Sequence, residues 1–186
     1  TLDPTVDGLS ELCRAVLDGF PHPVTASHCV SLGQRPEAEQ RAVAELVAEA
    51  SVNVVTLPHT NLFLQGRERS PMPRALTAVD ALRRAGVNVA AGPDNLQDPF
   101  NPVGSACPFE TAGLMIMAAH LLPGDAWHSV SAAPARALGR PANGVSVGAP
   151  ADLLAVDATT LREAIAFGPV GRRRWRAGVL DGEIES

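Results

Sequence analysis

The sequence has no lysine and no tyrosine, and aromatic residues make up only 4% of its 186 positions. All 15 basic residues are therefore arginines. Without lysine, the residues shown cannot form a Schiff base with a carbonyl substrate, and they cannot supply the lysine of a phosphate-binding P-loop. These absences exclude two common kinds of enzyme chemistry for the residues shown.

Cysteine is scarce as well. Cys13, Cys29 and Cys107 lie far apart, and no CxxC pair is present. An odd number of dispersed thiols indicates free cysteines in a reducing compartment, and it disfavours a zinc site made of thiolates. No segment has the pattern of a signal peptide, so we expect a cytoplasmic protein. The sequence begins at Thr1 and not at methionine, which indicates that an upstream segment is missing.

Long apolar runs and basic patches are also lacking. No run reaches the roughly 18 apolar residues that a membrane-spanning helix needs. The net charge is −5, and positive charge is concentrated only in residues 172–176, RRRWR. We therefore expect neither a membrane nor a nucleic acid as partner. Hydrophobic residues make up 46% of the chain and charged residues 19%, which is typical of a globular protein.

What the sequence does contain is an alternation of apolar strands and helical segments. The apolar patterns predict strands at 22–27, 52–57 and 87–91, and helices at 9–18, 35–50, 74–86, 109–122 and 125–139. A long polar loop is predicted between residue 58 and about residue 73. The strands are continuously apolar, which is typical of a parallel sheet covered on both faces. No GxGxxG motif follows a strand, so the pattern favours part of a (β/α) barrel over a dinucleotide-binding fold.

The pattern of apolar residues changes near residue 140, from long helices and strands to short strands and turns. Residues 1–140 are predicted to form a partial (β/α) barrel, and residues 141–186 a small β addition. This second part is expected to hold a strand at 152–156, a short helix and a hairpin around Asp181-Gly182. A complete eight-stranded barrel takes about 250 residues. With at most four barrel strands here, the chain is either a smaller open sheet or the second half of a larger enzyme.

Polar side chains stand at the ends of the predicted strands. His28, His59 and Asp94 each follow an apolar run. Ligands and catalytic groups of parallel α/β folds gather at the carboxyl ends of the strands, so His28 and Asp94 could serve a metal site or an acid–base pair. The alternatives are a surface histidine, a turn-capping aspartate, and a loop position for His59. Cys29 adjoins His28, but neighbouring side chains on a strand point apart, which disfavours a thiol–imidazole pair.

Four segments resemble a known family. They are VTASHCVSL at 24–32, VNVVTLPHTNLFLQGR at 52–67, GVNVAAGPDNLQDPFNPVG at 86–104 and VSVGAPADLLAVDA at 145–158. In this order they resemble the C-terminal half of a cytosine-deaminase-type member of the metal-dependent amidohydrolase superfamily. The resemblance implies about strands five to eight of a (β/α)8 TIM barrel, with the C-terminal part of a β-sandwich domain. It also implies a divalent metal ion, zinc or iron, that activates water against the amine-bearing carbon of a cyclic amidine such as cytosine.

The same resemblance implies roles for four residues. His28 is similar to the histidine on the sixth barrel strand, which holds the attacking water and the substrate. Asp94 matches the aspartate after the eighth strand, a metal ligand that also takes a proton from the water. Asn95 and Phe100 fall where the family shapes its substrate pocket. The prolines of the Asp94 loop are expected to restrict its freedom.

Two features depart from the family pattern. The HxH motif that supplies two metal ligands has no counterpart here, and we expect it before Thr1. Thr1 and Pro4 align where the fifth strand of the family carries a metal-binding histidine and a proton-shuttling glutamate. The sequence therefore leaves two hypotheses, a hydrolase of cyclic amidines or a catalytically inactive homologue that acts as a binding or scaffold protein. A half-barrel that completes itself as a homo-oligomer through exposed strand edges is a further expectation.

Overall fold

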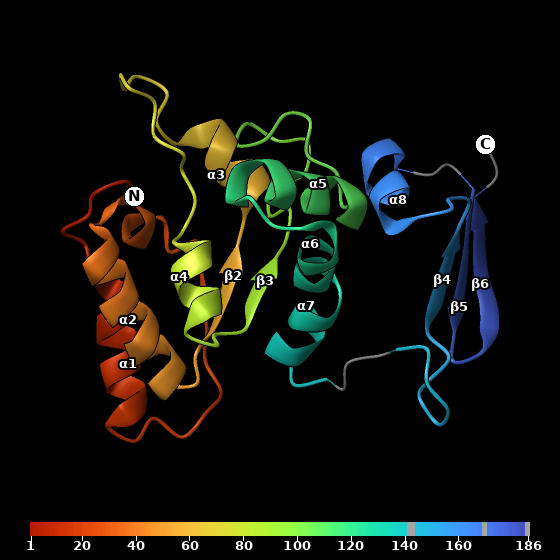
Figure 1. Cartoon of the computed structure of the whole chain (residues 1–186), viewed down its shortest axis with the longest axis horizontal. Coiled ribbons are helices and arrows are strands. Elements are labelled where there is room, and N and C mark those ends of the chain that lie inside the picture. The colour runs from red at the N-terminus through yellow and green to blue at the C-terminus, as the bar shows by residue number, and fades with distance from the viewer. Residues whose placement is uncertain (141–143, 169–170, 185–186) are drawn as a thin grey trace.

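The computed structural model describes residues 1–140, 144–168 and 171–184. It contains a three-stranded parallel sheet surrounded by helices and a separate three-stranded antiparallel sheet (Figure 1). The mixed α/β fold that the sequence predicts is therefore confirmed. The boundary predicted at residue 140 adjoins residues 141–143, which lie outside the described residues, so this division into two domains stays a prediction.

The parallel sheet has the strand order β1-β2-β3, in which the strands follow one another both in sequence and in space. Its members are β1 (Thr25–Ser27), β2 (Asn53–Thr56) and β3 (Val89–Ala91). The register pairs Ala26 with Val54, and Val54 in turn with Val89. All three of these side chains are buried, whereas Thr25 and Ser27 are exposed and Asn53 and Val55 are only half-buried. One face of β1 and β2 is therefore less covered than the other, and the sequence prediction of a sheet covered on both faces is not met on these two strands.

Helices flank the parallel sheet. They are α1 (Gly8–Leu17), α2 (Glu37–Glu49), α3 (Pro58–Leu64), α4 (Val79–Arg84), α5 (Pro108–Ala119), α6 (Pro123–Val130) and α7 (Ala132–Ala137), with a 3-10 helix, η1 (Val30–Gln34), after β1. Of these, α4, α5, α6 and α7 contact the strands of the sheet directly. Figure 1 shows α1 and α2 on one side of the sheet, with α6 and α7 on the other. One apolar core runs through these layers and includes Val47, Leu82 and Met115.

One loop prediction and two helix predictions need correction. The segment after β2 is not entirely a loop, because Pro58 occupies the first position of α3, where its missing N–H costs no hydrogen bond. The helix predicted at 74–86 begins only at Val79. The helix predicted at 125–139 is two helices, α6 and α7, and the backbone leaves the helical conformation at Ser131 between them.

The antiparallel sheet consists of β4 (Leu153–Val156), β5 (Arg172–Arg176) and β6 (Val179–Ile184), in that order. The hairpin between β5 and β6 turns at Ala177 and Gly178, both with positive φ, and not at Asp181-Gly182 as the sequence predicts. The helix α8 (Leu161–Phe167) precedes this hairpin and contacts α5 and α6. The chain thus returns to the main core between β4 and β5, and Arg172 on β5 also contacts this core, with its guanidinium 5.1 Å from the centre of the Phe109 ring. Within the described residues, every helix is too short or too polar to cross a bilayer.

Candidate functional site

His28 and Asp94 each follow an outer strand of the parallel sheet. The ladder between β1 and β2 continues to His28, whose N–H donates to the Val55 carbonyl over 2.9 Å. The ladder between β2 and β3 continues to Gly92, whose N–H donates to the Thr56 carbonyl over 3.1 Å. The backbone then turns into positive φ, 65° at His28 and 68° at Asp94. These turns carry both side chains to the carboxyl end of the sheet, which is where the sequence predicts them.

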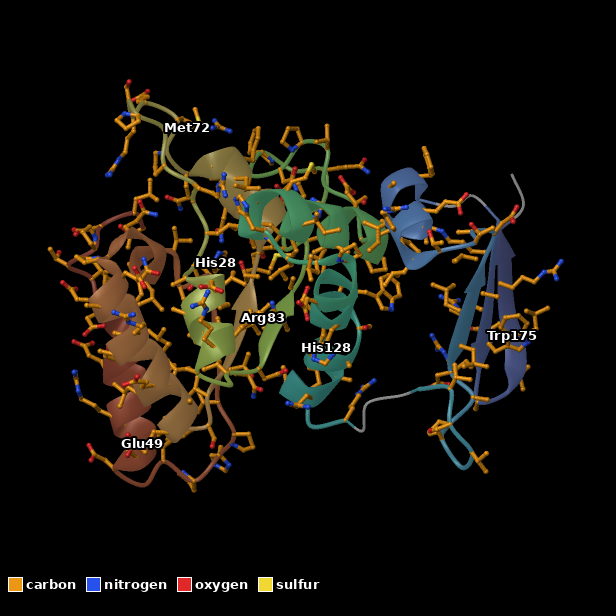
Figure 2. All side chains as sticks on the ribbon, viewed as in Figure 1. His28, Glu49, Met72, Arg83, His128 and Trp175 are labelled. Carbon is orange, nitrogen blue, oxygen red and sulfur yellow. The ribbon has the colours of Figure 1, made fainter. Side chains whose placement is uncertain are left out.

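The two side chains come close together across β2. His28 Nε2 lies 3.9 Å from Asp94 Oδ2, and the side chains are 42% and 35% exposed. This separation exceeds that of a direct hydrogen bond. Figure 2 labels His28 at the parallel sheet, well away from Trp175 on the antiparallel sheet. The half-exposed imidazole and carboxylate can therefore both reach a small molecule placed between them.

The first turn of α3 contacts His28 and the loop that carries Asp94. Asn61 Oδ1 accepts a hydrogen bond from Nδ1 of His28 over 2.9 Å. Thr60 lies close to the other side of the site, since its Oγ1 is 3.3 Å from the Pro93 carbonyl and accepts from the Asn95 N–H over 3.1 Å. Sequence reasoning missed both residues because it placed them in a polar loop. The Pro58 that follows β2 is the local signal that could have predicted this helix.

His59 is buried and is not the loop residue that the sequence suggested. Its Nε2 lies 3.0 Å from Thr111 Oγ1, and its Nδ1 lies 3.9 Å from Glu110 Oε1. Because the Thr111 hydroxyl donates to the Cys107 carbonyl over 3.4 Å, its oxygen is left to accept the proton of Nε2. Burial lowers the pKa of His59, and the Glu110 carboxylate opposes this shift. We assign His59 a structural role between α3 and α5.

The loop after Asp94 is held by its own polar side chains. Asn95 Nδ2 donates to Asp98 Oδ2 over 2.7 Å, and Asn101 Nδ2 donates to the Asn95 carbonyl over 3.2 Å. The hydrogen bond from Asn95, helped by the N–H groups of Phe100 and Asn101, lowers the pKa of Asp98 against the opposing effect of burial. Asn95 Oδ1 also accepts from the Thr60 hydroxyl over 3.0 Å. The side chain of Asn95 is thus engaged within the loop.

Phe100 lies at the far end of this loop and is 55% exposed. Its N–H donates to Asp98 Oδ1 over 2.8 Å, which fixes the backbone beneath the ring. Leu96 in the same loop is 49% exposed. Two apolar side chains are therefore exposed on the loop that begins at Asp94.

Cys29 follows His28 directly but lacks the properties of a nucleophile. Burial raises the pKa of its thiol to about 11, and the neighbouring Cys13 adds to this shift. The thiolate is the reactive form of cysteine, and it is scarce at neutral pH under these conditions. The Cys29 thiol is therefore a poor nucleophile, which leaves the His28 imidazole and the Asp94 carboxylate as the candidate reactive groups.

The described residues do not form a complete metal site by themselves. They nowhere bring three or more His, Cys, Asp or Glu side chains into one group that could hold a metal ion. A catalytic zinc ion takes three protein ligands and one open position. Asp94 could supply one carboxylate ligand, but the described part of the chain does not make a complete metal centre.

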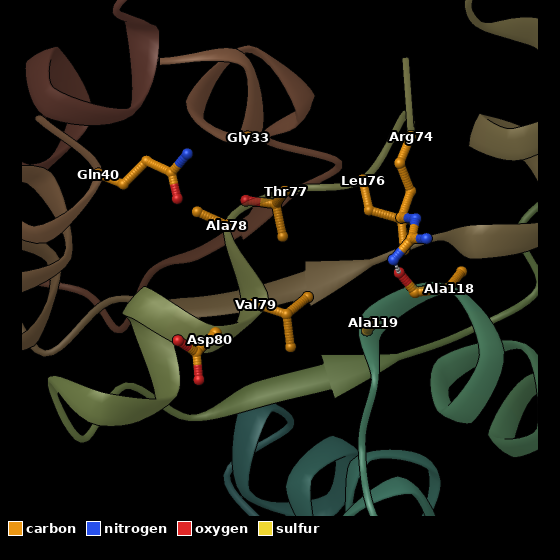
Figure 3. A pocket seen from close by; sticks show the side chains of 10 residues that line it. All are labelled: Gly33, Gln40, Arg74, Leu76, Thr77, Ala78, Val79, Asp80, Ala118 and Ala119. Atoms are coloured by element: carbon orange, nitrogen blue, oxygen red, sulfur yellow. Dashed lines mark hydrogen bonds between the residues drawn. The ribbon is translucent and has the colours of Figure 1, made fainter. Parts of the chain in front are cut away.

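A cavity of about 230 Å³ lies away from the His28 and Asp94 pair (Figure 3). It is bordered by α2, by the segment that leads into α4, and by the end of α5, with Gln40, Arg74 and Thr77 among its polar side chains. Arg74 is held at its edge by a hydrogen bond from Nη1 to the Ala118 carbonyl over 3.3 Å. Neither His28 nor Asp94 is among its lining residues, so this cavity is not part of the candidate site.

Known proteins match the chain over almost its whole length. A model of the amidohydrolase family matches residues 3–184. The sequence is 39% identical over 172 residues to a pterin deaminase of Rhizobium rhizogenes, an alignment that covers 89% of this chain and 39% of that protein. The chain therefore belongs to the amidohydrolase family, whose members hydrolyse carbon–nitrogen bonds, and the predicted resemblance to a deaminase-like amidohydrolase is confirmed.

Solved structures give the same result. The fold superimposes on 5-methylcytosine deaminase from Klebsiella pneumoniae liganded with 5-fluorocytosine, with a TM-score of 0.86 and 30% identity, over 99% of this chain and 46% of that one. It also matches N-isopropylammelide isopropylaminohydrolase from Burkholderia multivorans, with a TM-score of 0.78 and 33% identity, over 95% of this chain and 43% of that one. The chain thus spans less than half the length of these relatives.

Proposed function

We propose that this protein takes part in the hydrolytic removal of an amino group from a nitrogen heterocycle. The substrate class is a cyclic amidine, in which an amine-bearing ring carbon adjoins a ring nitrogen, as in cytosine or a pterin. The observation that carries this proposal is the approach of His28 Nε2 to Asp94 Oδ2, 3.9 Å apart at the carboxyl end of a parallel sheet. The similarity to a pterin deaminase and to 5-methylcytosine deaminase supports the substrate class.

The proposed roles follow from the chemistry of the two side chains. The Asp94 carboxylate takes a proton from the attacking water, and the His28 imidazole forms a hydrogen bond to that water or to the ring. Addition of water to the amine-bearing carbon, transfer of the proton held by Asp94 to the departing amino group, and loss of ammonia convert the amidine into a ring amide. Asn95 holds the loop that carries Asp94, and Phe100 supplies an apolar face beside the ring. The loop hydrogen bonds limit the motion of the carboxylate.

The zinc or iron ion of the family would supply Lewis-acid activation of the water, with Asp94 as one of its ligands. The described residues hold too few ligands for this ion, so no step of the reaction is assigned to it. In keeping with the relatives, we propose that residues 1–140 form the C-terminal half of a (β/α)8 barrel, about strands five to eight. We propose that residues 141–186 belong to a β-sandwich domain.

The test is ammonia release by the intact protein from cytosine, a pterin and an amino-triazine. Asp94→Asn keeps the size of the side chain but cannot accept the proton, so the rate should fall by at least about 100-fold. The control is Asp80→Asn on α4, an exposed partner of Arg84, which should leave the rate unchanged. An inactive homologue that only binds its ligand would show no turnover on any of these substrates, and Asp94→Asn would change no measured activity.

A further inference from the structure

Asn61 on α3 forms a hydrogen bond with the His28 ring, and this contact bears on the proposed reaction as well as on the fold. Asn61 is 2% exposed, whereas the imidazole that it contacts is 42% exposed. Both backbone polar groups of Asn61 are hydrogen-bonded within α3. Its N–H donates to the Leu57 carbonyl and its carbonyl accepts from the Gln65 N–H, each over 3.0 Å. A rigid, buried acceptor is thus held against a half-exposed ring.

The chemistry of this contact selects one form of the ring. An amide oxygen only accepts hydrogen bonds, so the ring nitrogen that faces Asn61 Oδ1 at 2.9 Å must carry the proton. In the neutral imidazole, the second nitrogen is then a bare acceptor. That nitrogen is Nε2, the atom that lies 3.9 Å from Asp94 Oδ2.

The separation across the site agrees with this assignment. Two acceptors cannot form a hydrogen bond with each other, and 3.9 Å lies outside hydrogen-bond range. A water molecule beside the two atoms, off the line that joins them, could donate one hydrogen bond to each. If Nε2 carried the proton instead, it would be expected to approach the carboxylate to about 2.8 Å as a direct donor.

Asn61 also carries a polar group that the fold does not use. Its Nδ2 is buried and has no hydrogen-bond partner among the described residues. Unsatisfied buried donors are uncommon and destabilise a fold. A leucine of similar shape would avoid this donor, so packing alone does not account for an asparagine at this position.

We infer that Asn61 is a positioning residue, which holds His28 as the Nδ1–H tautomer and thereby presents Nε2 to the reacting water. The inference rests on the proposed function, because it assigns His28 a task in that reaction. Asn61 itself does not touch the reacting atoms. It acts on the orientation and protonation site of the ring, and through them on the rate.

The test uses Asn61→Leu in the intact protein, with the nitrogen-15 resonances of the His28 ring as the first readout. At about pH 8.5, where an ordinary imidazole is neutral, the unchanged protein should show a protonated Nδ1 and a bare Nε2. Asn61→Leu should shift the ring to a mixture of both tautomers. An Nε2–H ring in the unchanged protein, or the same tautomer in both proteins, would overturn the inference.

Stability and kinetics provide the second readout. Removing an unsatisfied donor should leave the unfolding midpoint of Asn61→Leu unchanged or higher, because water can reach the exposed His28 ring. The kcat for deamination should nevertheless fall by about 10- to 100-fold, with little change in KM. A lower midpoint together with an unchanged kcat would mean that Asn61 only supports the fold, which would contradict the inference.

The matched control is Asn53→Leu at the opposite end of β2. Asn53 accepts a hydrogen bond from Asn88 Nδ2 over 2.9 Å, so its replacement should lower stability and leave the His28 tautomer unchanged. A change of tautomer in this control would count against the inference. The NMR readout also separates the two claims. A protein that shows the Nδ1–H ring but releases no ammonia from any substrate would refute the proposed function, and would leave the positioning contact supported.

Discussion

Among single residues, His59 and His28 show how differently two histidines can be used one strand apart. Both rings follow a strand of the parallel sheet. His59 is buried against Thr111, whereas His28 is partly exposed beside Asp94. Residue type and position after a strand are common to both, and the sequence analysis, which gave His59 a loop position, did not predict its burial. The difference in burial depends on α3, whose first turn carries His59 into the core.

The buried state of His59 has a measurable effect on stability. Burial lowers its pKa in the folded chain, so the unfolded chain takes up the proton first, at about pH 6.5. The full contribution of the neutral ring is therefore present above about pH 6.5, and it is lost as the pH falls from there through the lower pKa of the folded chain. We expect His59→Gln to flatten this part of the stability curve.

Urea unfolding between about pH 7 and pH 5 measures this effect. The free energy of unfolding of the unchanged protein should fall more steeply with decreasing pH than that of His59→Gln. The control is His22→Gln, because His22 is exposed in the loop before β1. If His59→Gln keeps the slope of the unchanged protein, the assigned burial effect is absent.

At the scale of single elements, the loop after β3 depends on one glycine. A Cβ at Gly104 would lie 2.2 Å from the Asn95 carbonyl oxygen and 2.5 Å from Asn101 Nδ2. Both atoms belong to the hydrogen bond that closes the loop. Gly104→Ala should therefore cost about 1–3 kcal/mol of stability through overpacking. It should also lower activity, because the same loop carries Asp94.

Thermal unfolding and the ammonia assay together test this prediction. Gly124→Ala is the matched control, since a Cβ at Gly124 meets no atom within 4 Å. Its effect on stability should stay within about 0.5 kcal/mol. Equal behaviour of the two variants would show that the close approach at Gly104 is relieved without cost.

The sequence predicted the elements that have strong local signals. The strand ends at His28 and Asp94 follow from apolar runs that stop abruptly, and α2 follows from its apolar stripe. The helix α3 was missed because it has only seven residues and begins where polar residues were expected. Asn61 could not be recognised for the same reason, since its contact with His28 joins residues 33 positions apart. Such contacts depend on how strands align in space, which no local pattern records.

At the scale of the whole molecule, α8 lies in sequence between β4 and β5 and packs on the main core against α5 and α6. Ile165 is 9% exposed and belongs to the main core cluster, whereas Phe167 on the same helix is 81% exposed. Ile165→Ala should cost about 2–5 kcal/mol, because it leaves a cavity against α5. The loss should also appear as faster amide hydrogen exchange in the antiparallel sheet.

Urea unfolding and hydrogen exchange of the two variants provide the test. Phe167→Ala removes a larger side chain but little buried area, so its effect should stay within about 0.5 kcal/mol. If the two alanine variants are equally stable, α8 does not anchor the antiparallel sheet to the core. Unchanged exchange in β4 to β6 after Ile165→Ala would lead to the same conclusion.

The positive φ angles at His28 and Asp94 have one more consequence. Glycine adopts this backbone conformation most readily, and histidine and aspartate are among the side chains that tolerate it. The imidazole and the carboxylate at these two bends therefore occupy a backbone conformation that glycine would adopt at a lower steric cost.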